Sequence, residues 1–312
     1  EICQPAMLTA DIAMMSWLNS QGVHPDYVVG HSLGEYAACV AAGVMEFEDA
    51  LHAVSARGKE MASVDVPDCG KMATVAAGVD VVEKHLKSID GYVVAANQNC
   101  HAQTVIAGST AAVESAVAHF QKLGVDSREI PVSHAFHSEI VAPAAVPLRR
   151  VLDSLSLKAP TLPIISNVGA QEYPQSSEGI SGLLAKQMAS PVEFISQVER
   201  LHDDGIRVFV EVGPRRAITG FVKNILDGRE HLAIHTNHHK RDDLLGAFDA
   251  VAAIFASGGD KVHTETVEPD AVLTESVTRP HLDDTTITPC AVSGLAVLMP
   301  QTNPVEAVDT DW

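Results

Sequence analysis

Apolar residues recur every three or four positions in long stretches of the chain, and they form short continuous runs between those stretches. The helical spacing indicates amphipathic helices, and the short runs indicate strands that are buried on both faces. Helices are predicted over residues 2–18, 35–43, 46–61, 137–155, 180–201 (with a break at Ser190-Pro191), 217–226 and 244–256. Strands are predicted over residues 27–30, 162–167 and 208–212. Because strands alternate with helices, we expect a parallel sheet with helices on both faces.

The rhythm changes between residues 71 and 132, where the predicted elements become shorter. Strands are expected over residues 72–77, 92–96, 103–107 and 127–132, and helices over 79–86 and 111–123. This β-α-β-β-α-β order is typical of a ferredoxin-like subdomain. We therefore expect a large α/β subdomain made of residues 1–66 and 134–257, a ferredoxin-like subdomain inserted at residues 67–133, and a cleft between them.

The C-terminal segment, residues 258–312, differs from the rest in composition. It holds ten acidic residues, two basic residues (Lys261 and Arg279) and five prolines. This composition predicts a flexible acidic linker, in which residues 291–299 form one apolar island. At the other end, Glu1 leads directly into a helical pattern, so we expect the natural polypeptide to continue upstream.

Composition excludes several functional classes. The 312 residues include 21 Lys and Arg against 40 Asp and Glu, a net charge of −19, and aromatic residues make up only 4%. Nucleic-acid and anionic-membrane binding need clustered cations, so neither partner is expected. No apolar run reaches the length of a membrane span, and no signal peptide is visible. The five cysteines show no paired spacing, which favours reduced thiols and a cytoplasmic location.

One short motif indicates nucleophilic catalysis. Gly30-His31-Ser32-Leu33-Gly34 matches G-x-S-x-G and lies between a predicted strand and a predicted helix. Such a nucleophile elbow exposes the serine hydroxyl, and the helix behind it directs the following amide toward an oxyanion. Ser32 is thus the candidate nucleophile, and the Leu33 amide is a candidate oxyanion donor. With 15 histidines in the chain, the residues alone do not select a base.

Three segments resemble the malonyl-CoA:acyl-carrier-protein transacylase family: the elbow continued by Glu35-Tyr36, the Arg57-Gly58-Lys59-Glu60-Met61 segment, and Glu211-Val212-Gly213-Pro214. Over residues 1–257 the sequence as a whole most resembles the acyltransferase domains of type I polyketide and fatty-acid synthases. The resemblance implies a hydrolase-like α/β fold that moves a malonyl unit from CoA to the phosphopantetheine thiol of an acyl carrier protein through a Ser32 ester. It implies no bound cofactor and no metal, with the carrier protein and neighbouring synthase domains as partners.

The resemblance also assigns roles to residues outside the elbow. His137 corresponds to the catalytic base, and the backbone carbonyl of Gln187 to the group that orients it. Arg57 corresponds to the arginine that binds the free carboxylate of malonate, a pairing that suits a bidentate guanidinium. The remaining substrate-binding candidates are His134 and Phe136, as a wall against an α-methyl branch, and Asn99.

Two alternatives stay open at this point. A serine hydrolase or thioesterase would share the elbow, although it would need a carboxylate to orient the base and gives no reason for Arg57. A catalytically weak structural block of a multidomain synthase is the other. The family's Gly-Gln-Gly-x-Gln segment, which supplies a second oxyanion donor, is expected upstream of Glu1, and one such donor is worth roughly 10²–10³ in rate.

Overall fold

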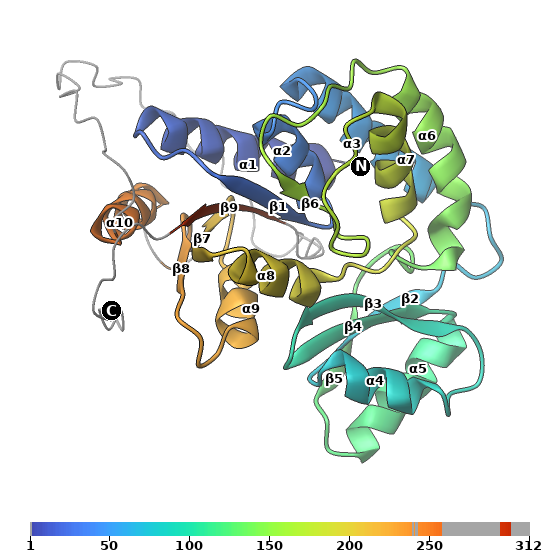
Figure 1. The fold of residues 1–312 in the computed structure, drawn as a ribbon. Coiled ribbons are helices and arrows are strands. Elements are labelled where there is room, and N and C mark those ends of the chain that lie inside the picture. The colour runs from blue at the N-terminus through green and yellow to red at the C-terminus, as the bar shows by residue number, and fades with distance from the viewer. Residues whose placement is uncertain (1, 239, 241–242, 258–293, 301–312) are drawn as a thin grey trace.

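The computed structural model describes residues 2–238, 240, 243–257 and 294–300, and it contains two β-sheets with separate helical layers (Figure 1). The larger sheet has the strand order β6-β1-β9-β7-β8. Its strands are β1 (Tyr27–His31), β6 (Ile164–Ile165), β7 (Ile206–Val212), β8 (Leu232–His235) and β9 (Gly294–Pro300). Strand β1 pairs with β6 in parallel, and β7 pairs with β8 in parallel.

Strand β9 corrects two sequence-based expectations. It lies between β1 and β7 and runs antiparallel to both, so the sheet is mixed rather than parallel. It also falls within the predicted 258–312 linker, whose other residues lie outside the described part of the chain. The physical reason is that two parallel strand pairs leave facing edges with unpaired backbone groups. An apolar run far along the chain can pair with both edges, and a local pattern cannot reveal such a partner.

Helices cover the larger sheet on both faces (Figure 1). One layer contains α1 (Cys3–Ser20), α2 (Gly34–Ala41), α3 (Phe47–Ala62), α6 (Ala145–Asp153) and α7 (Ser177–Gln187). The other layer contains α8 (Phe194–Asp203) and α9 (Ala217–Ile225). Helix α10 (Asp243–Ala256) packs beside β8, at the edge of the sheet. The break predicted at Ser190-Pro191 within residues 180–201 is confirmed, because α7 ends at Gln187 and α8 begins at Phe194, with Pro191 between them. The predicted helix over 137–155 is a 3-10 turn, η1 (Glu139–Ala144), followed by α6.

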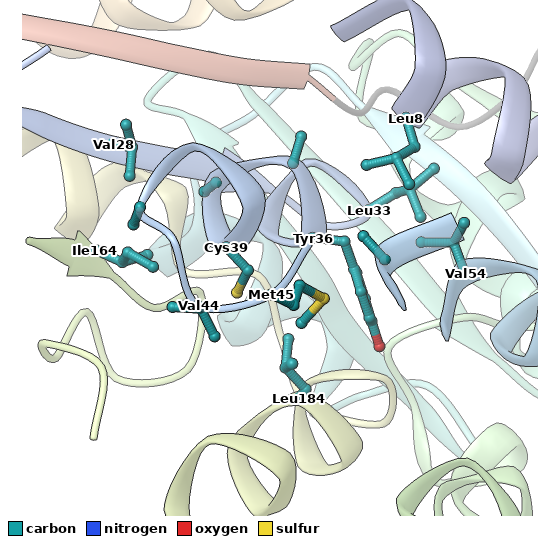
Figure 2. Close-up of a cluster of buried hydrophobic side chains, with 14 of the residues drawn as sticks. Leu8, Val28, Leu33, Tyr36, Cys39, Val44, Met45, Val54, Ile164 and Leu184 are labelled. Atoms are coloured by element: carbon teal, nitrogen blue, oxygen red, sulfur yellow. The ribbon is translucent and has the colours of Figure 1, made fainter. Parts of the chain in front are cut away.

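The buried core follows the alternation of side chains along the strands. Val28 packs into the cluster beneath α1, α2, α3, α6 and α7, of which Figure 2 shows a part, whereas Val29 packs into the cluster beneath α8 and α9. Tyr36 on α2 is fully buried in the first cluster. The elbow strand is thus fixed from both faces, which holds its carboxyl end in place for the site.

The smaller sheet has the order β3-β4-β2-β5 and is antiparallel throughout. Its elements along the chain are β2 (Lys71–Val75), α4 (Val79–Leu86), β3 (Val93–Cys100), β4 (Gln103–Gly108), α5 (Thr110–Lys122) and β5 (Ser127–Ile130). One face packs on α4 and α5. The other face packs against the segment that contains Ala135, Phe136 and Ile140. The smaller sheet therefore supports the chain on both sides of His137.

Two other findings bear on the sequence analysis. Cys39, Cys69 and Cys100 are free thiols, whereas Cys3 takes part in a disulfide, so the expectation of reduced thiols is wrong for Cys3. Across the described ranges, no helix combines the length and the apolar character that a membrane crossing requires.

Candidate active site

The elbow lies where β1 ends and α2 begins. Ser32 has a φ of 54°, in the left-handed region that side-chain-bearing residues seldom adopt. Gly30 must lack a side chain, because a Cβ there would lie 2.1 Å from the Glu35 amide nitrogen. Leu33 directly precedes α2, so its amide belongs to the helix N-terminus, where N–H groups have no partner within the helix. These features match the tight strand-to-helix turn expected of a nucleophile elbow.

Ser32 and His137 are in hydrogen-bond contact, with 2.7 Å between Ser32 Oγ and His137 Nε2. His137 also has a left-handed backbone, with a φ of 58°. Its Nδ1 lies 3.2 Å from the Gln187 carbonyl oxygen and 3.1 Å from the Ser190 carbonyl oxygen. Because carbonyls only accept, Nδ1 carries the proton and Nε2 is left to accept from the serine hydroxyl. The arrangement is a serine–histidine dyad oriented by backbone carbonyls at the C-terminal end of α7.

Burial keeps the base neutral. Desolvation lowers the pKa of His137 to about 3, and the positive charge of Arg57 and the nearby His31 act in the same direction. The two carbonyl contacts oppose this shift only in part. A neutral imidazole is the form that can take a proton from Ser32. His137 is therefore in its neutral, proton-accepting form at neutral pH.

Arg57 is buried on α3, and no acidic residue in the described part of the chain forms an ion pair with it. Its side chain is 4% exposed, and Nη1 donates a 2.9 Å hydrogen bond to Gln4 Oε1 on α1. Within the described ranges, no carboxylate lies within ion-pair distance of the guanidinium, and Nε has no hydrogen-bond partner. Burial lowers the pKa of Arg57, and Tyr36 and Glu35 offset this in part. A buried cation of this kind is costly unless an anion binds to it.

The other predicted substrate-binding residues fall into two groups. His134 and Phe136 lie together beside the base, with ring centroids 6.4 Å apart; His134 is buried and Phe136 is half-buried. Asn99 lies at the junction of the two sheets. Its Oδ1 is 2.8 Å from His31 Nε2, and its Nδ2 donates to Gln103 Oε1 at 2.9 Å. The amide of Asn99 is thus already engaged by protein groups on both sides.

Two buried amides at the elbow escaped the sequence analysis. Asn167 Oδ1 accepts a 2.7 Å hydrogen bond from the Ser32 amide, and the Gln187 side chain donates a 2.7 Å hydrogen bond to the Ser32 carbonyl. The position of Asn167 in the sequence could have indicated its place beside the elbow. It follows β6, and the carboxyl ends of adjacent parallel strands meet at one edge of a sheet. The side chain of Gln187 carries no such signal, because it lies at the end of a helix 155 positions from Ser32.

Comparison with known proteins places the chain in a family. Residues 1–269 match the acyl transferase domain family model. The malonyl CoA-acyl carrier protein transacylase of Bacillus subtilis strain 168 is 38% identical over 228 residues, which cover 71% of this chain and 71% of that protein.

Solved structures give the same answer. The acyltransferase domain from the second module of the salinomycin polyketide synthase aligns with a TM-score of 0.74 and 32% identity, over 83% of this chain and 60% of that chain. The malonyl CoA-acyl carrier protein transacylase of Coxiella burnetii aligns with a TM-score of 0.72 and 32% identity, over 81% of this chain and 78% of that one. The chain belongs to the acyl transferase domain family.

Proposed function

We propose that the chain is a malonyl-CoA:acyl-carrier-protein acyltransferase of fatty-acid or polyketide biosynthesis, with Ser32 as nucleophile and His137 as base. The names of its relatives support the donor and the acceptor. The observation that carries the proposal is the buried Arg57 guanidinium, which lies near the dyad and forms no ion pair with a carboxylate of the described residues. The elbow alone needs no such cation, whereas an acyl group with a free carboxylate does.

The reaction proceeds in two steps that exchange one thiol for another. In the first, His137 Nε2 takes the Ser32 hydroxyl proton while Oγ attacks the thioester carbonyl. The carbon–sulfur bond then breaks, and the proton passes from His137 to the departing sulfur of CoA. In the second, the phosphopantetheine thiol gives its proton to His137 and attacks the ester, and Ser32 leaves with that proton. The Leu33 amide stabilises the oxyanion of both tetrahedral intermediates.

Three side chains would determine which acyl group is bound. Arg57 would bind the malonyl carboxylate through charge-assisted hydrogen bonds. His134 and Phe136 would limit the space for an α-methyl branch, a discrimination worth about 1–3 kcal/mol for one methyl. Asn99 would act beside the elbow, where its contact with His31 supports a role in aligning the smaller sheet with the acyl group.

The proposal extends to partners, location and organisation. The chain would act in the cytoplasm on a carrier protein, next to further synthase domains in the same polypeptide. Residues 1–66 with 134–257, and residues 67–133, would form two subdomains with the substrate between them. No bound cofactor is required, because malonyl-CoA supplies the acyl group and the carrier supplies the phosphopantetheine.

Covalent loading tests the proposal directly. The purified chain, incubated with malonyl-CoA that carries a radiolabel in the malonyl group, should acquire a label that persists until a pantetheine thiol is added. Ser32→Ala should abolish the label. Rapid release of free malonate would indicate a hydrolase instead. Retention of the label in Ser32→Ala would show that the nucleophile is a different residue.

A further inference from the structure

The strained residue at the elbow is held by side chains as well as by secondary structure. Ser32 has a left-handed backbone and is 8% exposed, so its polar backbone groups need partners inside the protein. Its N–H donates to Asn167 Oδ1, and its carbonyl accepts from Gln187 Nε2, both at 2.7 Å. The first residues of α2 contribute one further bond, from the Glu35 amide to the Ser32 carbonyl. A residue in this conformation persists only where its surroundings determine it strongly.

Asn167 is bonded at every polar group. Its side-chain nitrogen donates to the Gly30 carbonyl and, at 3.4 Å, to Gln197 Oε1. Its backbone N–H donates to Glu35 Oε1 at 3.2 Å, and its backbone carbonyl accepts from the Glu193 amide at 3.0 Å. The side chain thus bridges Gly30 and Ser32, the two residues that flank His31 in the elbow. No other described side chain contacts the elbow backbone at both of these points.

Gln187 links the nucleophile to its base. Its backbone carbonyl faces His137 Nδ1, and its side chain donates to the Ser32 carbonyl. The same side-chain nitrogen lies 3.4 Å from Asn167 Oδ1, so the two amides form one buried unit. Any shift of Asn167 therefore changes the position of the serine relative to the imidazole.

We propose that Asn167 is a positioning residue that sets the direction of Ser32 Oγ toward His137 by clamping both sides of the elbow. This inference rests on the assignment of Ser32 and His137 as the reacting pair. Asn167 has no role in binding the acyl group, because its side chain is fully buried and fully engaged with protein groups. Its loss should lower the rate of acylation and leave the affinity for malonyl-CoA nearly unchanged. A misplacement of about 1 Å costs roughly 100-fold in rate.

The first experiment uses Asn167→Ala in the full chain. Single-turnover acylation with labelled malonyl-CoA should slow by about 100-fold at saturation, with the half-saturating concentration within about threefold of wild type. Rates are divided by the number of sites that eventually load, so that unfolded protein does not count. Ser127→Ala is the matched control: Ser127 is also buried and donates one hydrogen bond to a carbonyl, that of Val117, but it lies on β5 in the smaller sheet. It should keep the wild-type rate per site.

The second experiment uses Asn167→Asp, a substitution that leaves the volume of the side chain nearly unchanged. In its neutral form the new carboxyl can accept from the Ser32 amide and donate to the Gly30 carbonyl, as the amide does. In its ionised form it cannot donate and repels that carbonyl. Its titratable and charged neighbours are Glu35 on α2, Tyr173 and Cys39 near Glu35, and His137 and Arg57 beyond Ser32. Because these groups are present in both proteins, the ratio of variant to wild-type rate cancels their titration except where it is coupled to the new carboxyl, as for Glu35.

The ratio decides the inference even if the alanine variant does not fold. We expect the ratio to be highest at pH 5.5 and to fall by about tenfold for each pH unit above the pKa of the new carboxyl. A ratio that stays constant between pH 5.5 and 8.5 would overturn the proposal, as would a wild-type acylation rate per site in Asn167→Ala. Labelling of Ser32→Ala would instead refute the proposed function, so the two failures are distinguishable.

Discussion

Replacing Arg57 with methionine should make the protein more stable while removing its selectivity for malonyl groups. Methionine resembles arginine in length and helix propensity, so α3 should tolerate the change. In the structure, one hydrogen bond to Gln4 is the only one that the guanidinium makes within the described ranges. Its burial therefore costs free energy that no ion pair returns. A stability gain and a functional loss in one variant would be the signature of a ligand-binding cation.

The magnitudes follow from the burial of the charge. Exchanging buried ionic groups for apolar ones of similar volume is often neutral or stabilises a protein by about 1–4 kcal/mol. We expect a gain of about 1–3 kcal/mol, which for a protein of this size raises the Tm by roughly 1.5 °C per kcal/mol. In the transition state for acylation of Ser32, the lost hydrogen bond between Arg57 and the malonyl carboxylate is worth about 1.5–3 kcal/mol. This corresponds to a loss of roughly 10- to 150-fold in the rate of malonyl loading.

Two measurements on the same samples check this prediction. Thermal unfolding followed by circular dichroism gives the stability, and competition between malonyl-CoA and acetyl-CoA in single-turnover loading gives the selectivity. Arg128→Met, at an exposed position on β5, is the control and should change stability by no more than about 0.5 kcal/mol. Arg57→Met that loses stability, or that keeps the full malonyl preference, would show that Arg57 supports the fold and that the carboxylate is read elsewhere.

Two further substitutions test the wall beside the acyl group and a buried carboxyl on α1. Phe136→Ser should leave malonyl loading largely intact and improve methylmalonyl loading by about tenfold, because one methyl contact has that value; unchanged competition between the two CoA esters would remove Phe136 from the wall. Asp11→Asn tests the buried carboxyl on α1, whose pKa is raised from 3.8 to about 8, first by burial and then by the charge of Glu211. A carboxyl that holds its proton longer in the folded state loses stability as pH rises between those values, by at most about 1.4 kcal/mol per pH unit. The stability advantage of Asp11→Asn in urea unfolding should therefore grow between pH 5.5 and pH 8, and an advantage that is equal at both values would contradict the burial of a carboxylate there.

Local chemistry explains why much of the site was predictable from the sequence. The elbow needs a glycine, a serine and a strand-to-helix turn within five consecutive positions, so Gly30 and Ser32 carry the signal themselves. The helices and the elements of the smaller sheet follow from spacing over short windows, which the sequence contains in full. The resemblance to a family then added His137 and Arg57, which no local pattern could have distinguished from the other histidines and arginines.

The tertiary structure decided whatever depends on which distant residues meet. Asn167 and the Gln187 side chain reach Ser32 across 135 and 155 positions of chain, and no short pattern records such a contact. The absence of an acidic partner for Arg57 within the described ranges, and the antiparallel entry of β9 into the sheet, are likewise properties of packing. A backbone group or a buried charge must find its partner in space, whereas the hydrophobic pattern of a sequence specifies only which face of each element is buried.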